Sequence, residues 1–142
     1  MTFLLDTTVV SEWVKSRPNR GVVTWLAQVD EDRVFISVVT LAELRYGIER
    51  MPPGSRRKRL DEWFRDELPL RLEGRVLSID PLVADSWGRL VARSEAAGRP
   101  ISAMDALIAA TAETHDMTLV TRNTSDFEAS LRLLINPWAE DD

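Results

Sequence analysis

The chain has 142 residues, a formal net charge of −5 at pH 7, 44% hydrophobic residues and 29% charged residues, which is typical of one globular domain with a sizeable core. It has no cysteine and a single histidine, so disulfides and thiolate metal sites are excluded, and the sequence argues against zinc or a histidine-based catalytic pair. The negative charge argues against a basic surface that coats nucleic acid. We expect residues 1–142 to form a single domain.

The N-terminal stretch MTFLLDTTVVSEW has no basic leader, and its short apolar run ends at Asp6. Such a start is typical of neither a signal peptide nor a membrane span. We therefore expect a cytoplasmic protein.

Five short apolar runs, bounded by polar or turn residues, are predicted to be buried strands. They are TFLL (residues 2–5), RVFIS (33–37), RVLSI (75–79), MTLV (117–120) and RLLI (132–135). Helical segments separate the runs, which show little alternation of apolar and polar residues. This order predicts an α/β fold with a mostly parallel sheet covered by helices on both faces. In such a fold the ligand site lies at the carboxyl ends of the strands.

Each predicted helix follows a residue whose side chain is suited to cap it. These caps are Asp6 for residues 7–15, Asn19 for 20–29, Thr40 for 41–50, Ser55 for 56–68, Asp80 for 82–97, and Ser102 for the helix in ISAMDALIAATA (101–112). Gly98 is expected to end the helix over 82–97.

The helix predicted over 56–68 begins with the basic run RRKR. Residues four apart along it carry opposite charges, which is typical of a solvated helix face. The pairs are Arg57 with Asp61, Lys58 with Glu62, and Asp61 with Arg65. Contact with a nucleic-acid backbone is the alternative for this run.

Three acids stand where predicted strands give way to helices. Asp6 directly follows the first strand, Glu43 follows the second by a short turn, and Asp105 lies in the first turn of a very apolar helix. Each also fits a helix cap or capping box, which is the structural alternative. Three carboxylates at one sheet edge would repel one another unless a cation lay between them. Oxygen ligands suit Mg²⁺ or Mn²⁺, which bind phosphate oxygens, so phosphodiester hydrolysis is the leading chemistry.

The loop after the fourth predicted strand, TRNTSDF, adds Thr121, Arg122, Asn123 and Asp126 at the same predicted edge. Residues of these polar types are common turn formers, which is one explanation for them. Arg122 is also a candidate for contact with a phosphate.

The segments LLDTTVVSE, VVTLAELRYGIER, SAMDALIAATAETHDMTLVTRNTSDF and INPW together resemble the PIN-domain toxins of bacterial toxin–antitoxin pairs, of the VapC and FitB type. The resemblance covers essentially the whole chain. It implies a three-layer α/β/α PIN-like fold and an endoribonuclease that depends on Mg²⁺ or Mn²⁺. It also implies inhibition by a small cognate antitoxin, a homodimer and a toxin–antitoxin hetero-oligomer. From the N-terminal sequence we expect no membrane partner.

By this resemblance Asp6, Glu43 and Asp105 match the family's first three acids. Asp6 and Asp105 are expected to be the principal metal ligands, and Glu43 to hold the metal or position the attacking water. At the fourth position several relatives carry an aspartate where this chain has Asn123, which adds no negative charge. Asp126, three residues further on, is the candidate substitute ligand, and the two residues complete the expected catalytic set.

Two other functions remain open from the sequence. A binding-only PIN-like domain without metal would use its acids as helix caps, and metal titration separates it from the enzyme. An aspartyl-phosphate phosphatase would also carry an acid after its first strand, but Thr8 stands where such an enzyme has its general acid.

Overall fold

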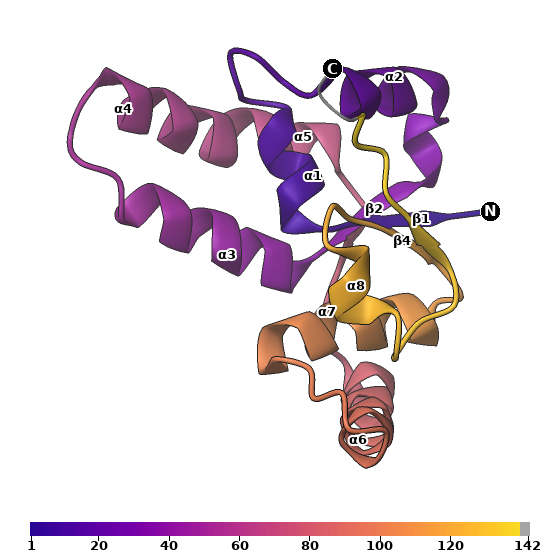
Figure 1. The fold of residues 1–142 in the computed structure, drawn as a ribbon. Coiled ribbons are helices and arrows are strands. Elements are labelled where there is room, and N and C mark those ends of the chain that lie inside the picture. Colours follow the sequence, from indigo (N-terminus) through magenta and orange to yellow (C-terminus); the bar gives the residue numbers. More distant parts are fainter. Residues whose placement is uncertain (140–142) are drawn as a thin grey trace.

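The computed structural model describes residues 1–139 and shows a five-stranded parallel sheet between two layers of helices (Figure 1). The strands lie in the order β3-β2-β1-β4-β5, and all neighbouring pairs are parallel. Their bounds are β1 Phe3–Leu5, β2 Val34–Ser37, β3 Val76–Leu77, β4 Thr118–Val120 and β5 Leu134–Ile135. Each strand falls within one of the predicted runs, and the predicted α/β fold is confirmed.

The helices connect these strands and cover both faces of the sheet. Their bounds are α1 Thr7–Glu12, α2 Arg20–Gln28, α3 Val38–Glu49, α4 Ser55–Glu62, α5 Leu68–Arg71, α6 Pro81–Ala96, α7 Ala103–Thr114 and α8 Thr124–Phe127, with a short 3-10 turn at Glu31–Arg33 and a π-helical turn at Trp63–Glu67. None of the helices within residues 1–139 is long and apolar enough to cross a membrane.

Adjacent residues of the central strands feed two separate cores, because successive side chains of a strand point to opposite faces. Leu4 of β1 and Leu119 of β4 pack with residues of α6, α7 and α8. Their neighbours Leu5 and Val120 pack on the other face with residues of α1, α2, α3 and α5. The sheet is therefore buried on both sides, which explains the continuous apolar runs in the sequence.

Side-chain hydrogen bonds confirm four of the predicted caps, which are Asn19, Asp80, and (see below) Asp6 and Ser102. The Asn19 side chain accepts from the amides of Gly21 and Val22, and Asp80 accepts from the amide of Val83 at 2.9 Å. Ser102 caps α7 (see below), and Gly98, which follows α6, has a φ of 71°.

Two predicted caps are wrong. The helix α3 begins at Val38, and its cap is Ser37, whose hydroxyl accepts from the amide of Val39 at 3.0 Å. Thr40 lies in the first turn instead, because β2 runs into α3 without a loop. Likewise Ser55 is the first residue of α4 rather than its cap, and the preceding Gly54 has no side chain with which to cap.

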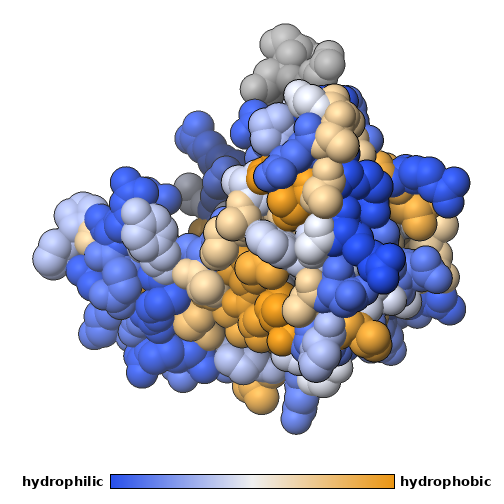
Figure 2. Space-filling view, turned by 90° about the horizontal axis from the view of Figure 1, so that it is seen from below, coloured by the Kyte–Doolittle hydropathy of each residue, from blue (hydrophilic) through white to orange (hydrophobic). Residues whose placement is uncertain are grey.

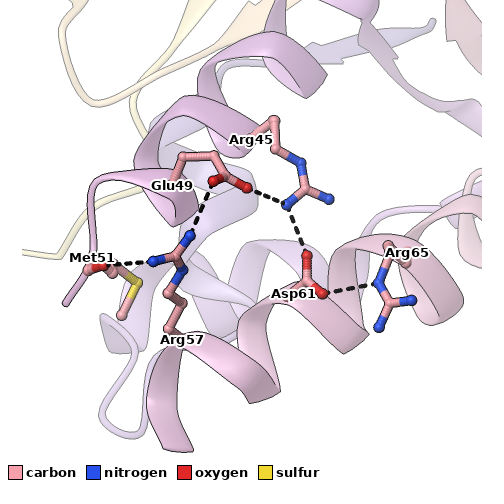
Figure 3. Close-up of polar contacts among 6 residues, drawn as sticks. All are labelled: Arg45, Glu49, Met51, Arg57, Asp61 and Arg65. Atoms are coloured by element: carbon pink, nitrogen blue, oxygen red, sulfur yellow. Dashed lines mark hydrogen bonds and ion pairs between the residues drawn. The ribbon is translucent and has the colours of Figure 1, made fainter. Parts of the chain in front are cut away.

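The helices α3 and α4 form an arm that projects from the sheet and is joined by ion pairs (Figure 3). Arg45 of α3 binds Asp61 at 2.7 Å and Glu49 at 3.2 Å. Arg57 binds Glu49 at 3.0 Å, so its predicted pairing with Asp61 is wrong, whereas the pair of Asp61 with Arg65 is confirmed at 2.9 Å. The prediction used spacing within one helix only, whereas Asp61 and Arg57 of α4 also pair with residues of α3.

The remaining predicted pair, between Lys58 and Glu62, is not among the ion pairs formed within residues 1–139. On the face seen from below, Figure 2 shows the arm as mostly hydrophilic, with a group of apolar side chains beside it. A grouped apolar surface with a polar rim is typical of a protein contact surface.

The position of the α3 cap gives a test of this register. We expect Ser37→Ala to lower the free energy of unfolding by about 1 kcal/mol, because the amide of Val39 loses its acceptor. The matched variant Ser55→Ala should change it by less than about 0.5 kcal/mol, since Ser55 does not cap α4. Urea denaturation measures both, and equal losses for the two variants would contradict the assignment.

Candidate functional site

The carboxylate of Asp6 lies at the carboxyl end of β1 and is only 6% exposed. Its Oδ1 accepts from the amide of Thr7 at 2.8 Å, which makes Asp6 the N-cap of α1. Its Oδ2 accepts from the hydroxyl of Thr121 at 2.7 Å and from that of Thr8 at 3.2 Å. A buried carboxylate needs such donors, so Asp6 is fixed in position by both of its oxygens.

Glu43 lies in α3, which directly follows β2 in the chain. Its Oε1 accepts from the hydroxyl of Thr7 at 2.6 Å, and the amide of Thr7 donates to Asp6. Thr7 thus bridges the two acids. Burial raises the pKa of Glu43, the charges of Asp6 and Asp105 raise it further, and the hydrogen bond from Thr7 opposes the increase.

Asp105 lies in the first turn of α7, where its amide donates to the Ser102 hydroxyl at 3.2 Å. The reciprocal bond of a capping box, from the Ser102 amide to the Asp105 carboxylate, is not among the hydrogen bonds of residues 1–139. Burial raises the pKa of Asp105, as do the charges of Asp6 and Asp126, while a hydrogen bond with Ser102 opposes the increase. The cap therefore belongs to Ser102, and the Asp105 carboxylate lies within electrostatic range of Asp6 and Asp126.

The loop between β4 and α8 contributes a further hydrogen-bond donor to Asp6. The buried Thr121 hydroxyl donates to Asp6 and accepts from the amide of Asn123 at 3.0 Å. The side chains of Asn123 and Asp126 are exposed. Asp126 and Asp105 line the same open pocket between α7 and α8. The structure therefore brings Asp6, Glu43 and Asp105 within electrostatic range of one another, with Asp126 on the Asp105 side.

Comparison with known proteins identifies the family of the chain. The family model of the PIN domain matches residues 3–129. The chain belongs to the PIN-domain family. It is 39% identical to "VapC ribonuclease Y4jK" of Sinorhizobium fredii over 135 residues, which cover 95% of this chain and 96% of the relative.

Two further relatives are of the FitB type. The chain is 36% identical to "Toxin FitB" of Neisseria gonorrhoeae, with 95% of this chain and 97% of that protein covered. The solved structure of FitAB bound to a DNA fragment matches with a TM-score of 0.92 and 35% identity, covering 99% of both chains.

Sequence reasoning missed the threonines of this PIN-domain site. Thr7, Thr8 and Thr121 supply the hydroxyl donors to the acids, whereas the sequence pattern predicts a hydrogen bond to an acid for none of them. The available signal was the repeated order of a buried strand followed by polar residues, in LLDTT and LVTRN. Hydroxyls beside an acid that must be buried are its natural donors.

The residues present fit a hard divalent cation by their chemistry, because the donors are carboxylate oxygens and the charge of Asp6 raises the pKa of both Glu43 and Asp105. In the part of the chain that is described, residues 1–139, no three such side chains are already arranged around one ion position. The oxygens of Asp6 and Glu43 are held by threonine donors instead. Binding of a cation at the PIN-domain site would therefore require the carboxylates of Glu43 and Asp105 to turn toward Asp6.

The raised pKa of Asp105 gives a prediction with a definite sign. The folded state binds this proton more tightly than the unfolded chain, so the acid lowers the free energy of unfolding as pH rises from about 4 through the folded pKa. We expect Asp105→Asn, in metal-free protein at pH 7, to melt no lower than the parent. Its advantage should shrink as the pH falls toward 4.

The matched variant is Ser102→Ala, which we expect to lower the free energy of unfolding by about 1 kcal/mol because it removes the cap. Thermal melts of both variants at several pH values make the measurement. An Asp105→Asn variant that melts as low as Ser102→Ala at pH 7 would show that the carboxylate is itself the cap.

Proposed function

We propose that this protein is an endoribonuclease that depends on Mg²⁺ or Mn²⁺ and acts as the toxin of a toxin–antitoxin pair. The observation that carries the proposal is the fixed, buried carboxylate of Asp6 at the end of the central strand, close enough to Glu43 and Asp105 that its charge raises the pKa of both. Relatives similar over nearly the whole chain are named as a ribonuclease and as a toxin, which supports the same chemistry.

In this proposal Asp6 and Asp105 are the principal metal ligands, with Glu43 and Asp126 as further ligands. Asp6 is suited to the role because three donors fix its position before any ligand arrives. A bound Mg²⁺ or Mn²⁺ would supply electrophilic stabilisation of the phosphate oxygens and promote deprotonation of a nearby water.

Glu43 has the role of holding the attacking water and accepting its proton. Its raised pKa makes it a stronger proton acceptor than an exposed glutamate. The hydroxyl of Thr7 fixes one carboxylate oxygen, so the other remains for the cation or for the water. As the water oxygen bonds to phosphorus, the water's proton passes to Glu43. The bond from phosphorus to the leaving ribose oxygen breaks, and that oxygen takes up a proton from solvent.

The proposed partners are a small cognate antitoxin, an RNA substrate and a second copy of the chain. The similar solved structure is that of FitAB bound to a DNA fragment. Its similarity to this chain supports the proposal of an antitoxin partner. The group of apolar side chains beside the α3–α4 arm (Figure 2) is a surface that a partner would cover.

The test is cleavage of a synthetic single-stranded RNA by the purified protein. We expect cleavage with Mn²⁺ or Mg²⁺ and none in excess EDTA. Asp6→Asn should reduce the rate by more than about 100-fold, since loss of even an outer partner of a metal ligand costs about 10- to 100-fold. Asp85→Asn, an exposed acid of α6 paired with Arg89, is the matched control and should cleave normally.

Cleavage that persists in EDTA, in a preparation free of host ribonuclease, would overturn the dependence on metal. A folded protein that neither cleaves RNA nor is stabilised by Mn²⁺ would favour the binding-only domain. That alternative has one observation in its support, because Asp6 does cap α1.

The fourth position of the site gives a second prediction. If Asp126 replaces the acid that is absent at Asn123, Asp126→Asn should weaken the stabilisation of the fold by Mn²⁺, measured as the shift in melting temperature. Asn123→Asp should strengthen it, because a carboxylate is restored next to Thr121. The control for the loss of charge alone is Glu128→Gln, at an exposed acid that directly follows α8. Equal shifts in all three variants would exclude Asp126 as a ligand.

A further inference from the structure

The segment formed by residues 136–139 follows β5 and returns across the molecule to the start of α2 (Figure 1). The side chain of Asn19 holds it there through both backbone groups of Ala139. Asn19 Nδ2 donates to the Ala139 carbonyl at 2.9 Å, and the Ala139 amide donates to Asn19 Oδ1 at 2.9 Å. The Asn19 amide in turn donates to the buried carboxylate of Glu12 at 2.9 Å. The segment is therefore docked on a fixed part of the α1–α2 connection.

Gly21, in the first turn of α2, allows this close approach. A Cβ at this position would lie 2.3 Å from the Pro137 carbonyl oxygen and 2.4 Å from the Ala139 amide nitrogen. Both are backbone atoms, so no side-chain rotation relieves the clash. Any larger residue at position 21 must displace the 136–139 segment.

The segment also contacts Arg122 in the loop after β4. The Arg122 guanidinium lies over the ring of Trp138, 5.6 Å from its centre. The Asn136 side chain donates to the Arg122 carbonyl at 3.5 Å. Arg122 directly follows Thr121, whose hydroxyl binds Asp6. An exposed guanidinium is thus held by an aromatic ring, on a residue whose backbone amide donates to the Thr8 hydroxyl, which in turn donates to Asp6.

We propose that the 136–139 segment positions Arg122, and that Arg122 binds a phosphate of the RNA strand next to Asp6. The inference rests on the proposed function, since it takes RNA as the substrate. A guanidinium pairs with phosphate through two parallel hydrogen bonds. An arginine already stacked on an aromatic ring loses less conformational freedom on binding than a free one. Arg122 is the binding residue in this scheme, and Asn19, Gly21 and Trp138 are positioning residues.

The test measures binding of a fluorescent single-stranded RNA without divalent metal, by anisotropy, over a series of NaCl concentrations. Arg122→Ala should weaken binding about tenfold or more, as expected for a charged hydrogen bond, and lower the slope of log K against log salt by about 0.7, the value for one phosphate contact on a single strand. Gly21→Ala should shift both quantities in the same direction although it removes no charge. Gly88→Ala, where an added Cβ meets nothing within 4 Å, is the matched control and should bind as the parent does.

A second positioning variant covers the case in which Gly21→Ala does not fold. Trp138→Leu keeps an apolar side chain but removes the ring beneath Arg122, and it should reproduce the loss of affinity. Parent-like affinity and salt slope in Arg122→Ala would overturn the phosphate contact. Weaker binding in Arg122→Ala alone, with parent-like Gly21→Ala and Trp138→Leu, would overturn the role of the segment.

The same measurements separate this inference from the proposed function. A parent protein that cleaves RNA while all these variants bind normally contradicts only the inference about Arg122. A parent protein that neither binds nor cleaves RNA contradicts the proposed function, and the inference fails with it.

Discussion

A buried charge at the end of the central strand is the constraint on which the rest of the site depends. The carboxylate of Asp6 is almost fully enclosed, and an enclosed carboxylate without donors is costly. The chain meets this cost with the Thr7 amide and with the hydroxyls of Thr8 and Thr121. These donors come from α1 and from the end of β4, so the hydrogen bonds that make Asp6 tolerable also fix two neighbouring elements around it.

The order of the strands brings the other groups to the same place. β1 lies between β2 and β4 in a parallel sheet, so the segments that leave these three strands emerge at one edge. α3 carries Glu43 from β2, and the β4–α8 loop carries Thr121 and Arg122. Asp105 does not follow a strand. It lies in α7, the helix that precedes β4 in the chain and packs against one face of the sheet. The site is therefore the product of topology and not of any single motif.

The strands and most helices could be predicted because their cause is local. Apolar runs predict buried parallel strands, and residues such as Asn19 and Asp80 cap the helices that follow them. Thr40 and Ser55 could not be excluded as caps in the same way, because the helix starts at Ser37 and Gly54 depend on how the preceding chain arrives. Arg57 likewise had a partner in its own helix by spacing, and it binds Glu49 across the arm instead.

The proximity of the acids could be predicted from the sequence, because strand ends are few and charges at them are conspicuous. Their donors could not be predicted, because threonine has many ordinary uses and its hydrogen-bond partner is set only when the chain folds. Thr121 is separated from Asp6 by 115 positions, so no local pattern relates them. The contact of Ala139 with Asn19, 120 positions apart, is of the same kind.

The raised pKa values of Glu43 and Asp105 affect the stability of the fold. Each of these ionised groups makes the fold less stable near neutral pH, since the folded chain holds their protons more tightly than the unfolded chain does. A helix cap would have the opposite effect, because the positive end of a helix favours the ionised form. Asp105 sits at such an end, and its pKa is raised nevertheless, so burial and the neighbouring charges outweigh the helix. In the proposed enzyme a bound divalent cation would offset this cost, because it favours the ionised acids and its chemistry matches oxygen donors alone.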